Sequence, residues 1–238
     1  MMIIAHRCGT FPALPENSVA AARRSLEVGA DMIELDIRFS RDGVPRVIHD
    51  PDFSRLCGIA RRVADVSAAE IAGFRYLEHP GEGPGTFAEF TTAGITPILI
   101  HFKLGAEELS RFLPVLEAAG YLDKVVVGVQ TLATLQAARR YPKPFKVLAF
   151  MKSLEEVQSF IAEGADIVRL WDPWVDAKAI EAIHAAGRLV WIMTGRPSDG
   201  SVGLVTPERL AEYFPLSPDG ILLNDVALGV QVAREKRR

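Results

Sequence analysis

The chain has 238 residues, of which 49% are hydrophobic and 24% are charged, and its formal net charge is −3. These values are typical of a globular protein with one sizeable core, and they argue against a general nucleic-acid binder, which usually carries a strongly basic face. Only two cysteines occur, so neither a disulfide framework nor a cysteine metal site is expected. The apolar start, Met1–Ala5, is too short for a signal peptide or a membrane span, which favours a cytoplasmic protein without membrane insertion.

A local pattern recurs along the chain: a helical stretch, a glycine, then a short strand of aliphatic and β-branched residues. The glycine suits a left-handed helix C-cap, and continuous apolar strands are typical of a parallel sheet covered on both faces. In chain order the expected strands are Met2–Ala5, Met32–Leu35, Ile98–Phe102, Val125–Val129, Val147–Phe150, Ile167–Leu170, Leu189–Met193 and Ile221–Asn224. Such alternation predicts an α/β fold, a (β/α)8 TIM barrel, as a single domain over residues 1–238. An open doubly wound sheet is the alternative, but no Gly-x-Gly-x-x-Gly turn follows the first strand.

One segment departs from this repeat. After Leu35 an extended run, Asp36–Ser40, meets Asp42-Gly43 and a second extended run, Pro45–His49. Asp-Gly between two such runs indicates a hairpin, which would place Asp36 beside residues 48 to 50. Residues 50 to about 85 hold many glycines, prolines and arginines. They are expected to form an insertion that covers the barrel mouth, with a short helix over Ser67–Phe74.

Three of the five histidines, His6, His49 and His101, fall at strand ends or on the returning hairpin. A single histidine there is most often a packing residue, but three at one barrel face beside two carboxylates favour an active site. The other two histidines, His79 and His184, are expected at the surface.

Glu34 and Asp36 are two residues apart on one strand, so their side chains share a face. Burying two unpaired carboxylates is costly, and a divalent cation would remove that cost. The alternative is that Arg7, Arg38 or Lys103 neutralises the pair.

Two cations are predicted next to this pair: Arg7 adjoins His6, and Lys103 follows His101. Cations near a bound metal suit a phosphate or phosphodiester oxygen. Glu16, just before the first helix, is positioned to hold Arg7 at such a substrate site.

Aromatic residues follow the sixth strand, where Trp171 and Trp174 are expected near the mouth. They would either stack on a sugar or a choline-like group, or pack beneath the Pro173 turn. Both readings stay open.

Several segments together resemble the glycerophosphodiester phosphodiesterases. They are His6-Arg7, Pro15–Ser18, Gly29–Asp36, Arg41–Gly43 and Val47–Asp50, then Arg55, Gly58, Ser67–Glu70 and Thr86–Glu89, and near the end Ser217–Asp225. The resemblance implies a TIM barrel with an insertion after the second strand. It also implies a small-molecule phosphodiester substrate, which is cleaved to glycerol phosphate and an alcohol. By the same resemblance, His6 and His49 would be the general acid and base, Arg7 would bind phosphate, and Glu34 and Asp36 would bind one calcium or magnesium ion.

Two departures from this family pattern stand out. The third strand of the family usually ends in Glu-x-Lys, whereas this chain has His101-Phe102-Lys103. Calcium and magnesium prefer oxygen ligands, so His101 as third ligand should weaken their binding and favour manganese, zinc or cobalt. The seventh strand carries Trp191–Thr194 where the family usually has Trp-Thr-Val-Asn, at the leaving-group end of the pocket, so Trp191 is a further candidate for substrate binding.

Three alternatives to ordinary glycerophosphodiester hydrolysis remain from the sequence. The substrate could be a sugar phosphodiester of the agrocinopine kind, because the third and seventh strands differ from the pattern. The enzyme could be a lyase resembling phospholipase D toxins, which release a cyclic phosphate. It could also be a non-catalytic binding protein in which His101 has impaired the metal site, although a binding protein needs no acid–base pair of histidines.

Overall fold

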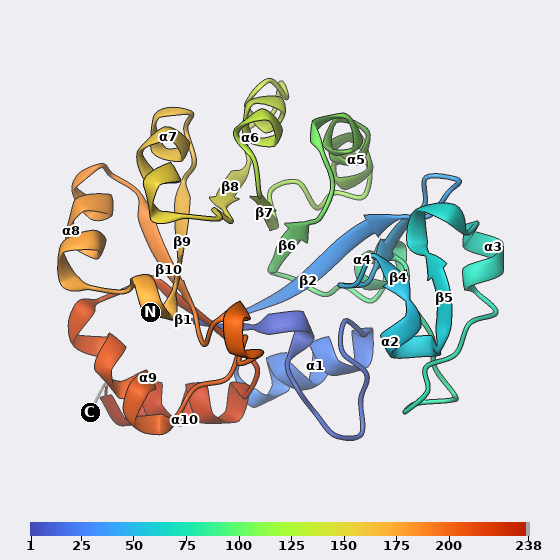
Figure 1. The fold of residues 1–238 in the computed structure, drawn as a ribbon, viewed down its shortest axis with the longest axis horizontal. Helices are drawn as coiled ribbons and strands as arrows, with labels where there is room; N and C mark the ends of the chain where they lie inside the picture. The colour runs from blue at the N-terminus through green and yellow to red at the C-terminus, as the bar shows by residue number, and fades with distance from the viewer. Residues whose placement is uncertain (237–238) are drawn as a thin grey trace.

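A computed structural model describes residues 1–236, and within this range the parallel strands close into a barrel (Figure 1). The barrel strands are β1 (Met2–Ala5), β2 (Met32–Phe39), β6 (Ile98–Phe102), β7 (Val125–Val129), β8 (Lys146–Ala149), β9 (Ile167–Trp171), β10 (Leu189–Met193) and β11 (Gly220–Leu223). Each pairs with its neighbour in chain order, and β1 closes the ring by pairing with both β11 and β2. The (β/α)8 TIM barrel expected from the sequence is thus confirmed, with strand ends within one residue of those predicted apart from the longer β2.

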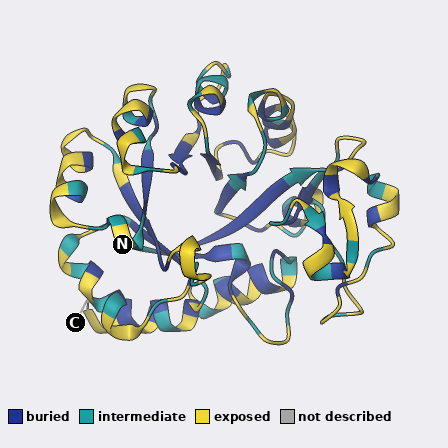
Figure 2. Ribbon diagram, in the orientation of Figure 1, coloured by how far each residue is buried: buried dark blue, intermediate teal, exposed yellow. Residues whose placement is uncertain are grey.

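Helices cover the outside of the ring. They are α1 (Val19–Val28), α4 (Phe87–Thr92), α5 (Ala106–Ala118), α6 (Leu132–Arg139), α7 (Val157–Ala162), α8 (Ala177–Ala185), α9 (Pro207–Tyr213) and α10 (Val226–Lys236). Each turns its buried residues toward the strands and its exposed residues outward (Figure 2). In α1, Ser18 caps the start by accepting from the Ala21 amide, and Gly29 ends the helix in the left-handed region at φ 113°. Within the described residues no helix is long and apolar enough to cross a membrane. The cytoplasmic location stays a prediction.

The second strand leaves the barrel as expected. β2 continues to Phe39 and pairs antiparallel with β3 (Pro45–Val47), with Ile37 opposite Val47. The Ile48 amide donates to the Asp36 carbonyl at 3.0 Å, so the hairpin brings residues 36 and 48 together.

Beyond the hairpin, a small unit projects from one side of the barrel (Figure 1). It contains α2 (Ser54–Cys57), α3 (Ala68–Ile71) and a separate sheet of β4 (Asp52–Phe53) and β5 (Ile59–Arg62). We call the chain between residues 50 and 85 the insertion. α3 starts at its Ser67 cap, within the predicted range Ser67–Phe74, and ends three residues earlier. The insertion has its own apolar cluster, which includes Phe53, Val66 and Ile71.

The interior of the barrel is filled by alternate residues of the strands, as the twofold repeat of a strand requires. Ile4, Met32, Leu99 and Leu222 belong to this interior cluster. Two residues further along the same strands, on the same inward face, come polar residues instead. The strand period therefore places Glu34, His101 and Asn224 directly above the apolar filling, at the C-terminal end of the barrel.

Candidate active site

A cavity of about 490 Å³ opens at this end of the barrel. The sequence-predicted residues in its wall are His6, Arg7, Glu34, His49, His101, Lys103 and Trp171. Asp36 is fully buried just behind the wall, and Glu16 and Trp191 do not line this cavity. The structure therefore brings the three predicted histidines, the cations Arg7 and Lys103, and the carboxylate pair to one place.

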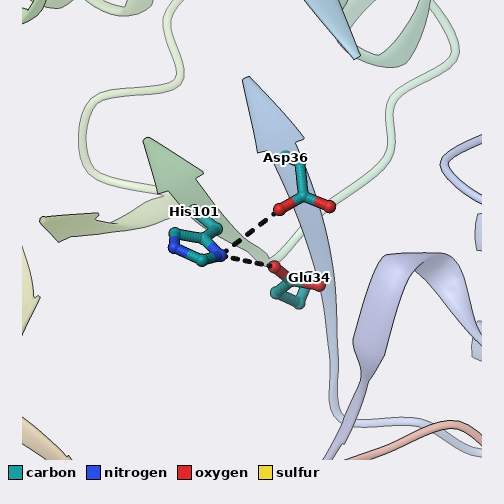
Figure 3. Close-up of side chains that lie close together, drawn as sticks. All are labelled: Glu34, Asp36 and His101. Atoms are coloured by element: carbon teal, nitrogen blue, oxygen red, sulfur yellow. Dashed lines mark ion pairs between the residues drawn. The ribbon is translucent and has the colours of Figure 1, made fainter. Parts of the chain in front are cut away.

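Glu34 and Asp36 on β2 face His101 on β6 (Figure 3). His101 Nδ1 lies 3.3 Å from Asp36 Oδ1 and 3.8 Å from Glu34 Oε1. One ligand atom from each of the three residues falls within 4.8 Å of the other two. Strand register explains the meeting, because Asp36 is directly opposite His101 in the parallel pair of β2 and β6.

Each carboxylate is held by one oxygen, and its other oxygen faces the cluster. The Arg7 amide donates to Glu34 Oε2 at 2.6 Å, and the Asn17 side chain donates to Asp36 Oδ2 at 3.1 Å. Arg7 itself has a left-handed backbone (φ 48°), which is uncommon for a residue other than glycine. Within residues 1–236, Glu34 Oε1 is buried with no hydrogen-bond partner, and Asp36 Oδ1 has only the ion-pair contact of Lys103 Nζ at 3.2 Å besides His101.

The protonation of Glu34 and Asp36 depends on their burial and on the charges beside them. Burial and the neighbouring Asp36 raise the pKa of Glu34 to about 8. Burial alone would also raise the pKa of Asp36, but Lys103 and His101 hold it well below its ordinary value. A buried oxygen without a donor, beside a second carboxylate and an imidazole, is a donor set that fits a divalent cation. The three residues are therefore a candidate metal site.

His101 is oriented from two sides. Its ring stacks on Phe150 with centroids 4.0 Å apart, and the Gln130 amide nitrogen donates to its Nε2 at 2.8 Å. Gly128 makes room for that stack, since a Cβ at this position would lie 2.2 Å from the Phe150 ring. Burial and Lys103 lower the pKa of His101 to about 3, which keeps the imidazole neutral. Gln130 can serve either tautomer, because its amide carries both a donor and an acceptor.

His6 is held at the end of β1 by a residue of the last strand region. Its Nδ1 is 2.7 Å from Asn224 Oδ1, while the amide nitrogen of Asn224 donates to the Val202 carbonyl. The amide orientation is thereby fixed, so Nδ1 carries a proton and Nε2 is free to accept one. Burial and then Arg7 lower the pKa of His6 to about 4.

His49 is held by a chain of charges that runs from the insertion to the first strand. Asp50 Oδ1 lies 2.7 Å from His49 Nδ1, and Arg55 Nε donates to Asp50 Oδ2 at 2.6 Å. Arg55 also donates to both oxygens of Glu16, at 2.6 and 3.1 Å, and Glu16 accepts from Arg7 at 3.4 Å. Arg55 and His49 together hold the pKa of Asp50 below its ordinary value. Glu16 thus contacts Arg7 as expected, but its stronger partner is Arg55.

The tryptophans take different positions. Trp171 lines the cavity, and the Arg169 guanidinium lies 4.0 Å above its ring and 5.6 Å from Trp174. Trp191 is 2% exposed and packs in the barrel interior, so it is not part of the cavity wall.

Several residues of the site were not singled out from the sequence. They are Asn17, Asp50, Gln130, Phe150, Arg169 and Asn224. Asn17, Asp50 and Asn224 stood within the motifs that carried the family resemblance. Strand alternation would have placed Phe150 and Arg169 on the inward face of their strands.

Comparison with known proteins agrees with this geometry. The sequence model of a protein family described as the glycerophosphoryl diester phosphodiesterase family matches residues 6–189 of this chain. A glycerophosphodiester phosphodiesterase from Caldanaerobacter subterraneus subsp. tengcongensis is 28% identical over 160 residues, which cover 61% of this chain and 65% of that protein. Human glycerophosphodiester phosphodiesterase 1 is 41% identical over 68 residues, which cover 29% of this chain and 20% of that protein. The chain thus spans less than two thirds of the length of these curated relatives.

Solved structures share the fold over nearly the whole chain. A glycerophosphodiester phosphodiesterase structure from Agrobacterium tumefaciens str. C58 has a TM-score of 0.80 at 22% identity, and the match covers 97% of this chain and 99% of that chain. An Oleispira antarctica phosphodiesterase in complex with the product sn-glycerol-3-phosphate has a TM-score of 0.82 at 17% identity, and the match covers 98% of this chain and 97% of that chain. Because the family model matches most of the sequence, the chain belongs to the glycerophosphoryl diester phosphodiesterase family.

Proposed function

We propose that this protein hydrolyses glycerophosphodiesters to glycerol phosphate and an alcohol with the help of one divalent cation. The observation that carries the proposal is one cavity that combines two differently held imidazoles, the cations Arg7 and Lys103, and a candidate metal site. Family membership supports the reaction class, and the Oleispira relative binds sn-glycerol-3-phosphate.

Glu34, Asp36 and His101 would hold the cation. When bound there, a divalent cation would polarise a phosphoryl oxygen and neutralise charge that develops on it. Two carboxylates and one imidazole give fewer hard oxygen ligands than three carboxylates. We therefore expect weaker binding of calcium and magnesium and better binding of manganese, zinc or cobalt.

His6 is suited to accept a proton and His49 to donate one. His6 is buried and neutral, and its Nδ1 is committed to Asn224, so Nε2 can take a proton from water as the new oxygen–phosphorus bond forms. The Asp50 carboxylate holds His49 by Nδ1, so when the ring carries a proton on both nitrogens its Nε2–H would protonate the departing alcohol oxygen. Arg7 and Lys103 would bind the phosphoryl oxygens.

Substrate series separate these roles. His49→Ala should lower kcat roughly 10²- to 10⁴-fold with glycerophosphocholine. It should lower kcat far less with glycerol 4-nitrophenyl phosphate, because nitrophenolate leaves without a proton. His6→Ala should lose a similar factor with both substrates. His184→Ala, on the exposed side of α8, is the matched control. Equal losses for His49→Ala with both substrates would contradict its role as the acid.

Product analysis under different metals tests the overall proposal. Glycerophosphocholine, glycerophosphoethanolamine and a sugar phosphodiester would be assayed with magnesium, calcium, manganese, zinc and cobalt. A cyclic phosphate as the final product would favour a lyase. Absence of turnover with every metal and substrate would favour a binding protein and overturn the proposal.

A further inference from the structure

Arg169 is the buried cation of the cavity wall that the proposed reaction does not use. It lies on β9 between Ile167 and Trp171, on the inward face of the strand, and it is 3% exposed while lining the cavity. Phe150 separates it from the candidate metal site: the Phe150 ring stacks on His101 on one side and lies 5.5 Å from the Arg169 guanidinium.

Two of the three side-chain nitrogens of Arg169 donate no hydrogen bond within the described chain. Nη2 donates to the Met151 carbonyl at 3.0 Å, whereas Nε and Nη1 are buried without a hydrogen-bond partner in the described chain. No carboxylate of the described residues pairs with it, although a buried arginine usually has such a partner. Stacking on Trp171 engages only the face of the guanidinium, so the N–H groups in its plane remain free for an acceptor.

The surroundings of Arg169 are also short of negative charge. Lys152, from the segment after β8, lines the same cavity. Its backbone amide donates to Glu156 at 2.7 Å, but its ammonium group forms no ion pair within residues 1–236. Glu34 is the one carboxylate in the described cavity wall, and it belongs to the candidate metal site. Burial lowers the pKa of Arg169 to about 9, which still leaves the side chain charged at neutral pH.

We propose that Arg169 and Lys152 form a second anion subsite, which selects phosphodiesters whose alcohol carries a carboxylate or a phosphate group. This inference rests on the proposed function, because it places the phosphodiester at Arg7 and Lys103 and the alcohol beyond Phe150. A buried donor that lacks an acceptor is costly, and an anionic oxygen at this end of the cavity satisfies it with a charge-assisted bond.

The same arrangement disfavours a choline-like alcohol. Trp171 has the Arg169 guanidinium over its ring at 4.0 Å, so one face of this ring is already occupied by a cation. A second cation beside Arg169 and Lys152 would meet like charge in a partly buried site.

Four glycerophosphodiesters that differ in the charge of the alcohol test the subsite. They are glycerophosphoglycerol, glycerophosphoglycerate, glycerophosphoglycerol phosphate and glycerophosphocholine. The wild type should show kcat/KM roughly 10- to 100-fold higher for the anionic compounds than for glycerophosphoglycerol, as the loss of a charge-assisted hydrogen bond predicts. Comparison of kcat/KM for glycerophosphoglycerate and glycerophosphoglycerol phosphate distinguishes a carboxylate subsite from a phosphate subsite.

Three variants and one control assign the preference to its residues. Arg169→Met should abolish the preference, and Arg169→Lys should retain part of it. Lys152→Gln, at an exposed position, should lower the preference severalfold, while Lys178→Gln on the exposed face of α8 is the matched control. A wild type that hydrolyses glycerophosphoglycerol or glycerophosphocholine as well as the anionic compounds would overturn the inference, as would an unchanged preference in Arg169→Met.

Binding without turnover keeps this inference separate from the proposed function. Kd values for the four compounds, measured by calorimetry on His49→Ala, should follow the same order and lose it in the double variant with Arg169→Met. If no compound is hydrolysed but the anionic ones bind more tightly, the proposed function fails and the subsite stands. Equal Kd values for anionic and neutral compounds would overturn the subsite.

Discussion

The His101→Glu substitution would place a third carboxylate in the candidate metal site. His101 Nδ1 is 3.3 Å from Asp36 Oδ1, and two full charges at this distance repel by about 5 kcal/mol at an effective dielectric constant of 20. Glu34 adds little repulsion near pH 7, because its pKa is already raised to about 8 by burial and Asp36. The new carboxyl can instead take up a proton, which limits the cost at pH 7 to about 4 kcal/mol.

We therefore expect the metal-free variant to lose about 4 kcal/mol of stability, or roughly 8–16 °C in Tm for a chain of this size. Calcium should restore most of this loss, since a ligand at 100 times its Kd contributes about 2.7 kcal/mol. The assay is thermal unfolding at pH 7, in chelator and in calcium, for wild type, His101→Glu and the uncharged control His101→Gln.

Calcium should raise the Tm of the wild type less than it raises the Tm of His101→Glu. Manganese or zinc should raise the Tm of the wild type more than calcium does. Two results would refute the reasoning. One is a calcium shift in the wild type as large as in the variant. The other is a metal-free His101→Glu protein as stable as His101→Gln, which would mean that the site does not concentrate negative charge.

Three further predictions follow from the charges around the site. Glu34→Gln should abolish turnover yet stabilise the metal-free protein by about 3 kcal/mol at pH 7. The reason is that a carboxyl with a raised folded pKa destabilises the fold increasingly between its unfolded value of about 4.5 and its folded value of about 8; an unchanged Tm in chelator would contradict this. Metal binding must displace the proton on Glu34, so the Kd of manganese, measured by calorimetry, should fall up to about tenfold per pH unit from pH 6 to 8 and stay constant above that range. A Kd that does not change with pH would count against Glu34 as a ligand. Arg55→Gln frees Asp50 and Glu16 and should lower kcat about tenfold, whereas Arg61→Gln, an exposed ion-pair variant in the same insertion, should not.

The barrel was predictable because its signal is local. Parallel strands covered on both faces are continuous apolar runs, and some of these runs have a chemically informative residue at or near their end, such as His6 or His101. The Asp42-Gly43 turn then gave the hairpin, and through it the position of His49.

Other parts of the site depend on the backbone conformation of single residues, or on how far a side chain lies below the cavity. The sequence pattern contains neither kind of information. Asn17 reaches Asp36 from a left-handed backbone (φ 56°), so its neighbour Ser18, and not Asn17, caps the helix. Trp191 and Arg169 are directly opposite each other on adjacent strands. Trp191 stays within the interior filling, whereas Arg169 has a longer, flexible side chain that reaches the cavity wall.

The two proposed acid–base residues belong to different parts of the fold: His6 ends a barrel strand, whereas His49 sits on the return of the hairpin and is braced by Arg55 in the insertion. The barrel can therefore keep its stability while the insertion varies in length or sequence. Such variation would change how often His49 meets a bound substrate, and so would adjust turnover without rebuilding the cation or phosphate contacts. In this fold the insertion, which influences the rate through His49, is thus physically separate from the barrel, which confers stability.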